Sequence, residues 1–140
     1  MNFHYSSMKL DQYGAANKLY GMAGIKIGEL AKSMAAKQVS ENLGDRWAFC
    51  ENGVIGYWAP EEEHSFTVDC PGTFSTLDSV DSKSLGIAFT IMAINHMVFD
   101  AYHQGDELLC EQLVGWQEEL RSYAFETEGF DGRAICNILD

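Results

Sequence analysis

One run in the middle of the chain predicts a tight β-hairpin, and it constrains the fold more than any other segment. The run reads Arg46-Trp47-Ala48-Phe49-Cys50-Glu51-Asn52-Gly53-Val54-Ile55-Gly56-Tyr57-Trp58-Ala59-Pro60. Asn and Gly tolerate the positive φ that a type I′ turn requires, so we expect the chain to reverse at Asn52-Gly53. This turn would place Trp47 opposite Trp58 and Phe49 opposite Gly56. Both faces of the hairpin are mostly apolar and should be covered, and the ladder should end at proline, which lacks an N–H donor.

The segment before the hairpin predicts one long helix. Apolar residues recur there at helical spacing over residues 15–37, after an irregular segment over residues 1–13. The members of this stripe are Leu19, Ala23, Ile27, Leu30 and Met34. Gly21, Gly24 and Gly28 would each weaken the helix, and close backbone packing is the favoured interpretation, because no strand precedes them as in a phosphate-binding loop.

The segments after the hairpin predict two more strands and then helices. Alternating apolar residues indicate strands over residues 65–70 and 73–77, joined by a turn at Pro71-Gly72. Asp81 is a suitable N-cap for an apolar helix reaching His103. A second long helix over residues 106–125 carries a stripe that consists of Leu109, Leu113, Trp116, Leu120 and Tyr123. Asp131 can cap a last short helix.

This order of elements is typical of the α+β class, and we expect a single domain over residues 1–140. The expected architecture is a small antiparallel sheet of about four strands, including the hairpin at Asn52-Gly53. An N-terminal helix and two to three C-terminal helices should pack with this sheet. No basic-then-apolar signal peptide opens the chain and no stretch reaches the ~20 apolar residues of a membrane span. We therefore expect a cytoplasmic protein without a membrane partner.

The net charge of −12 is unevenly distributed. Residues 1–60 carry six Lys or Arg against five Asp or Glu, whereas residues 61–140 carry three against sixteen. Such a surface repels nucleic acid and attracts basic partners, so direct nucleic-acid binding is not expected. A merely solvated acidic face is the alternative.

Few residue patterns indicate catalysis or metal binding. His96, Asp100 and His103 share one helix face and could in principle bind a metal, but a helix end with solvated polar residues is the favoured interpretation. The four cysteines have no C-x-x-C spacing and are interpreted as reduced. The sequence contains no Gly-x-Ser-x-Gly motif. We therefore expect no catalytic residues, no metal and no cofactor, and a protein that is not an enzyme.

Three segments resemble the ArdB/KlcA family of antirestriction proteins. They are the aromatic hairpin ending in Ala59-Pro60; Asp81-Ser82-Lys83-Ser84-Leu85-Gly86-Ile87 with Met92-Ala93-Ile94-Asn95-His96; and Leu120-Arg121-Ser122-Tyr123-Ala124-Phe125 with Ala134-Ile135 and Ile138-Leu139-Asp140. Together they cover residues 43–140 in the family's order. The chain departs from the pattern in a longer hairpin, in Ser84-Leu85 and in residues 127–130, so the resemblance implies a divergent member.

The resemblance implies a protein that inhibits type I restriction-modification enzymes and so protects incoming phage or plasmid DNA. Its partner would be the host restriction-modification complex, contacted directly or indirectly. Candidate partner-binding residues are Asp140, which matches the aspartate that ends the family pattern, together with Glu107, Glu111, Glu118, Glu119, Trp47 and Trp58. For the two tryptophans, a place in the core is the favoured interpretation. The alternatives are an inhibitor of another defence complex, such as a CRISPR effector, and a small metal-dependent enzyme that uses His96, Asp100 and His103.

Overall fold

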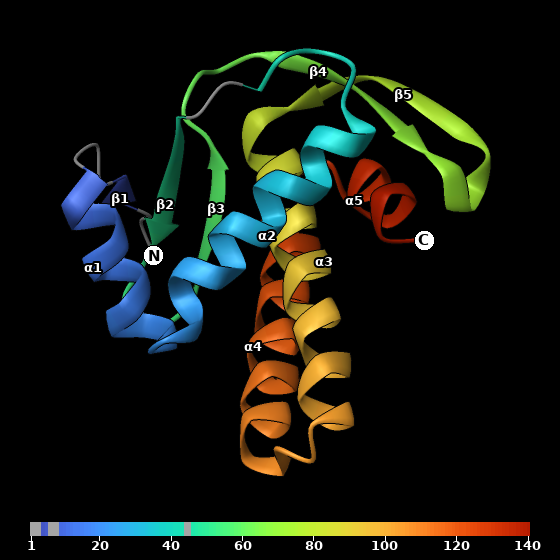
Figure 1. Ribbon diagram of the computed structural model, residues 1–140. Coiled ribbons are helices and arrows are strands. Elements are labelled where there is room, and N and C mark those ends of the chain that lie inside the picture. The colour runs from blue at the N-terminus through green and yellow to red at the C-terminus, as the bar shows by residue number, and fades with distance from the viewer. Residues whose placement is uncertain (1–3, 6–8, 44–45) are drawn as a thin grey trace.

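The computed structural model describes residues 4–5, 9–43 and 46–140 and confirms the α+β class (Figure 1). The described helices are α1 (Lys9–Tyr20), α2 (Ala23–Gln38), α3 (Ser82–His103), α4 (Glu107–Glu126) and α5 (Gly132–Leu139), with a 3-10 turn over Pro71–Thr73. The described strands are β1 (His4–Tyr5), β2 (Trp47–Glu51), β3 (Gly56–Pro60), β4 (Ser65–Cys70) and β5 (Ser75–Asp81). These strands form two antiparallel sheets, in the orders β1-β2-β3 and β4-β5, instead of one.

The central hairpin forms, but its predicted register is wrong by two residues. Trp47 pairs with Pro60 and Phe49 pairs with Trp58, and the last pair is Glu51 with Gly56. The loop is longer than a two-residue turn because the Asn52 side-chain oxygen accepts hydrogen bonds from the backbone N–H groups of Val54 and Ile55, both at 3.0 Å. Gly53 has the expected positive φ, at 91°. A shift by two residues leaves every side chain on its predicted face.

Both faces of the hairpin are covered, as the sequence predicts. On one face, Phe49 and Trp58 pack against α1 and α2, where the Trp58 indole N–H donates to the Gly24 carbonyl at 3.2 Å. On the other face, Tyr57 packs against Phe130 with ring centroids 5.9 Å apart, and α3 lies so close to β3 that a Cβ at Gly86 would lie 2.5 Å from the Cα of Ala59. The strand ends at Pro60, as predicted, but the Glu61 N–H still donates to the Arg46 carbonyl at 2.9 Å, so the missing N–H of proline is not what ends the pairing.

The single N-terminal helix predicted over residues 15–37 is two helices. The chain breaks between α1 and α2 at Gly21, whose φ of 63° lies in the left-handed region. The buried face of α2 is also rotated from the predicted stripe and consists of Gly24, Ile27, Gly28, Ala31 and Ala35. Small residues dominate because α2 packs tightly: a Cβ at Gly28 would lie 2.6 Å from the Trp58 indole.

The start of α1, the presence of β1 and the bounds of β5 also differ from the prediction. Residues 4–5 and 9–13 belong to β1 and α1 rather than to an irregular segment, and residues 1–3 and 6–8 lie outside the described part. The fourth predicted strand, 73–77, is β5 at Ser75–Asp81. The third predicted strand is β4 with its predicted bounds, and Phe66 and Val68 are buried on it.

The two predicted helix caps, Asp81 and Asp131, are confirmed, and Asp106 caps α4 in the same way. The Asp81, Asp106 and Asp131 side chains accept hydrogen bonds from the backbone N–H groups of Ser84, Leu109 and Ala134, respectively, at 3.1–3.2 Å. Helix α3 is central, with every residue from Leu85 to Ile91 buried. By length and composition α3 could span a membrane, but 67% of its most apolar window is buried in the fold, which fits the core helix of a small soluble protein.

Candidate partner-binding surface

Helices α3 and α4 form an antiparallel hairpin whose far end projects beyond the rest of the fold (Figure 1). Helix α3 ends at His103, and Gly105, with a φ of 76°, turns the chain. The Asp106 N–H then donates to the Ala101 carbonyl at 2.9 Å, and its side chain caps α4. The two helices are therefore joined by a short connection with its own hydrogen bonds.

The predicted apolar stripe of α4 packs into the fold. Leu113 and Leu120 are fully buried, and Leu109, Trp116 and Tyr123 lie partly buried against the core. Because this stripe faces inward, the acidic residues that lie off it are left at the surface. The glutamates at positions 107, 111, 118 and 119 are all exposed.

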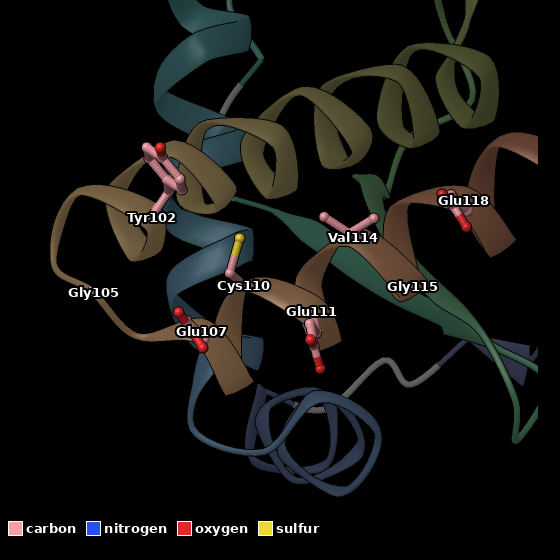
Figure 2. Close-up of a pocket in the computed structure, with 8 residues that line it drawn as sticks. All are labelled: Tyr102, Gly105, Glu107, Cys110, Glu111, Val114, Gly115 and Glu118. Atoms are coloured by element: carbon pink, nitrogen blue, oxygen red, sulfur yellow. The ribbon is translucent and has the colours of Figure 1, made fainter.

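Three of the four predicted glutamates line one groove beside the connection between α3 and α4. Its volume is about 470 Å³, and it is lined by Tyr102, Gly105, Glu107, Cys110, Glu111, Val114, Gly115 and Glu118. In Figure 2, Cys110 and Val114 project to the side of the α4 ribbon on which Tyr102 lies, whereas Glu111 projects to the other side. The groove therefore has an apolar side and an acidic side.

The fourth glutamate, Glu119, does not line this groove. Its negative charge instead acts on Tyr20. Burial is the main cause of the raised pKa of Tyr20, the hydrogen bond to Gly56 opposes that rise, and Glu119 adds to it. Tyr20 donates to the Gly56 carbonyl and accepts from the Gly56 N–H at 3.2 Å, which joins α1 to the hairpin. The predicted acidic set is thus divided between two parts of the surface.

Asp140 is exposed at the end of α5, far along the chain from the glutamates. Its backbone packs on the turn between β4 and β5, where a Cβ at Gly72 would overlap the Asp140 carbonyl. Asp140 lines none of the described hollows that we identify, including the groove. The structure therefore does not bring it together with Glu107, Glu111 and Glu118.

Trp47 and Trp58 are core residues, which confirms the favoured interpretation and removes them from the contact surface. Their exposed fractions are 2% and 1%, respectively. The Trp47 indole nitrogen has no hydrogen-bond partner among the described residues, whereas that of Trp58 donates to Gly24. Neither ring can anchor a partner in this conformation.

The alternative metal site is not assembled. His96 and Asp100 lie 3.6 Å apart, both about half exposed. Within residues 4–5, 9–43 and 46–140, no group of three or more His, Cys, Asp or Glu side chains converges as metal ligands would. The prediction that the protein is not an enzyme stays a prediction.

Sequence reasoning missed the apolar side of the groove. Tyr102 and Val114 lie off the predicted stripe, and such off-stripe apolar residues were a usable signal; Cys110 is also off the stripe, but it is partly buried against the core and its thiol donates to the Val98 carbonyl at 3.9 Å. Leu108, exposed to 70%, is a further example on the first turn of α4.

No protein-family model matches the chain, and no curated protein matches it.

Proposed function

We propose that this protein is a cytoplasmic antirestriction protein that inhibits type I restriction-modification enzymes and protects incoming phage or plasmid DNA. The order of the three ArdB/KlcA-like segments supports this proposal. The parts of the fold that carry these segments also contact one another, around the first half of α3. Gly86 packs on the hairpin at Ala59, the Thr90 hydroxyl accepts from the Trp58 N–H at 3.0 Å, and the Ser84 hydroxyl accepts from the Asp131 N–H at 2.9 Å.

The observation that carries the proposal is the charge of the projecting α3–α4 hairpin. Residues 84–120 contain no Lys or Arg, and they contain six acids: Asp100, Asp106, Glu107, Glu111, Glu118 and Glu119. This surface repels DNA phosphates, so protection would act on the DNA-handling enzyme rather than on the DNA. The partner would be the host restriction complex, reached directly or through another protein, and the mechanism needs no cofactor.

A plating panel tests the proposal against the alternative defence target. Unmodified phage is plated on three isogenic hosts that carry a type I system, a type II system or a CRISPR system, with the protein expressed at matched levels. We expect restored plating on the type I host only. Protection confined to the CRISPR host would replace the target with a CRISPR effector, and protection on none of the hosts would refute the proposed function.

A further inference from the structure

The groove on the α3–α4 hairpin leaves apolar side chains uncovered. Tyr102 on its rim is 72% exposed, and Phe99 and Leu108, which lie near the same end of the helix pair but do not line the groove, are 58% and 70% exposed. Large apolar side chains that gather on one surface mark interaction sites in soluble proteins. The apolar side of the groove, with Cys110 and Val114, continues this surface inward.

The acidic side of the groove is continuous along α4. Glu107, Glu111 and Glu118 follow one another at spacings of four and seven residues, which places them on one face of the helix. From Glu107 to Glu118 this face extends about 16 Å, at a rise of about 1.5 Å per residue. Neither helix of the hairpin supplies a Lys or Arg from residue 84 to residue 120 that could neutralise these carboxylates.

We propose that this groove is the docking site for an amphipathic helix of a partner protein, with apolar side chains on one face and Lys or Arg beside them. A groove that follows about three turns of α4 and has an apolar side fits the helix-in-groove mode, in which side chains at i, i+3, i+4 and i+7 enter the groove. The carboxylates would pair with the flanking cations and steer association. The proposal deepens the proposed function and rests on it in one respect: a subunit of the restriction complex would supply the helix.

The charge of the groove favours a basic helix over a second copy of the chain, nucleic acid or anionic lipid. A second copy of the chain docking through the same groove would bring two sets of three carboxylates together, which is unfavourable. Nucleic acid and anionic lipid carry the same sign of charge as the groove. A basic helix is the occupant that satisfies the apolar side and the acidic side at the same time.

A synthetic peptide tests the groove without the natural partner. The probe is a helical peptide of about 14 residues with leucine at positions i, i+3, i+4 and i+7 and lysine elsewhere, titrated into the ¹⁵N-labelled protein. We expect saturable binding, with amide shift changes concentrated in residues 102–118. Absence of binding at about 1 mM peptide would overturn the proposal. Shift changes concentrated around Met22 and Lys26 would also overturn it, because these residues line a second hollow, between α1–α2 and the α3–α4 hairpin.

Two glycines provide a matched pair of variants. A Cβ at Gly115, in the groove, or at Gly14, on α1, would meet nothing within 4 Å, so both sites accept a side chain. Gly115→Phe fills the groove and should weaken peptide binding by about tenfold or more, whereas Gly14→Phe should leave binding unchanged. Equal affinities for the two variants would overturn the proposal.

A second matched pair of variants distinguishes the effect of the groove carboxylates from the effect of net charge. The triple change of Glu107, Glu111 and Glu118 to Gln should weaken binding by about tenfold and reduce its salt dependence. The same change at Glu61, Glu62 and Glu63, which are exposed at the turn between β3 and β4, removes equal charge elsewhere. Equal losses from both triple variants would mean that the peptide senses net charge only, and the docking site would be refuted.

The outcomes also separate the docking site from the proposed function. If the wild-type protein protects phage but the peptide does not bind in residues 102–118, the docking site fails and the proposed function stands. If the peptide binds as expected and phage is not protected on the type I host, the proposed function fails and the docking site stands.

Discussion

Gly86 lies where α3 comes closest to the hairpin, and Gly86→Ala tests that packing. The added Cβ would overlap the Cβ of Ala59 and lie 2.5 Å from both the Ala59 Cα and the Trp58 carbonyl oxygen. Two of these atoms are backbone, so a side-chain rotation cannot relieve the overlap and α3 must move away from β3. Overpacking typically costs about 1–3 kcal/mol, and we place this case near 3. The better helix propensity of alanine returns about 1 kcal/mol, which leaves a net loss of about 2 kcal/mol.

Gly115→Ala is the matched control, because it makes the same substitution in a helix interior where an added Cβ meets nothing within 4 Å. It should raise stability by up to about 1 kcal/mol. For a chain of this size, about 4 °C accompanies each kcal/mol, so thermal unfolding should show Tm lowered by about 8 °C for Gly86→Ala and raised by about 4 °C for Gly115→Ala. A Gly86→Ala variant that melts at or above the wild-type temperature would refute the close packing of α3 on β3.

Three further substitutions test individual contacts. Tyr20→Phe should cost about 1–3 kcal/mol, because the Gly56 N–H and carbonyl lose their buried partner. Burial raises the pKa of Tyr20, so the stability from its neutral phenol is present below its unfolded pKa of about 10 and is lost as pH rises above it. Urea midpoints at about pH 8 and about pH 10.5 should therefore differ less in Tyr20→Phe than in the wild type, and an equal difference would contradict this. Asp81→Ala should cost about 1 kcal/mol in urea unfolding through loss of the α3 cap, and an unchanged midpoint would show that the cap is not needed. Phe74, 97% exposed, has a φ of 53°, so Phe74→Gly should raise Tm by relieving up to about 1 kcal/mol of backbone strain, and a lower Tm would mean that the aromatic ring makes stabilising contacts.

The features that could be predicted from sequence are those determined by neighbouring residues. Asp81, Asp106 and Asp131 cap their helices because a cap requires only an acceptor at the correct distance along the chain. The bounds of β4 follow from the alternation that ends at Cys70 before Pro71. These are local signals, and tertiary packing does not override them here.

The features that could not be predicted depend on contacts between distant segments or on competing local bonds. The apolar spacing continues across Gly21, so periodicity alone does not reveal the break between α1 and α2. The hairpin register depends on the Asn52 side chain, which holds Val54 and Ile55 in a longer loop. The division of the strands into two sheets leaves no periodic signal.

The candidate surface was predicted only in part, for the same reason. Helical spacing places Glu107, Glu111 and Glu118 on one exposed face, as the structure has them. The groove itself requires Tyr102 from α3 to lie beside α4, which the sequence of α4 cannot indicate. Asp140 lies away from these glutamates because α5 packs beside β4 and the turn that follows it.

The measurement that tests the central claim most directly is the ratio of plating efficiencies of unmodified and modified phage on one type I restricting host. It is measured with and without the protein, after soluble expression has been verified. Inhibition of the restriction enzyme predicts a ratio that rises toward one when the protein is present, because restriction is then relieved for unmodified DNA. A ratio that stays at its restricted value, with folded protein present in the cell, would contradict the account.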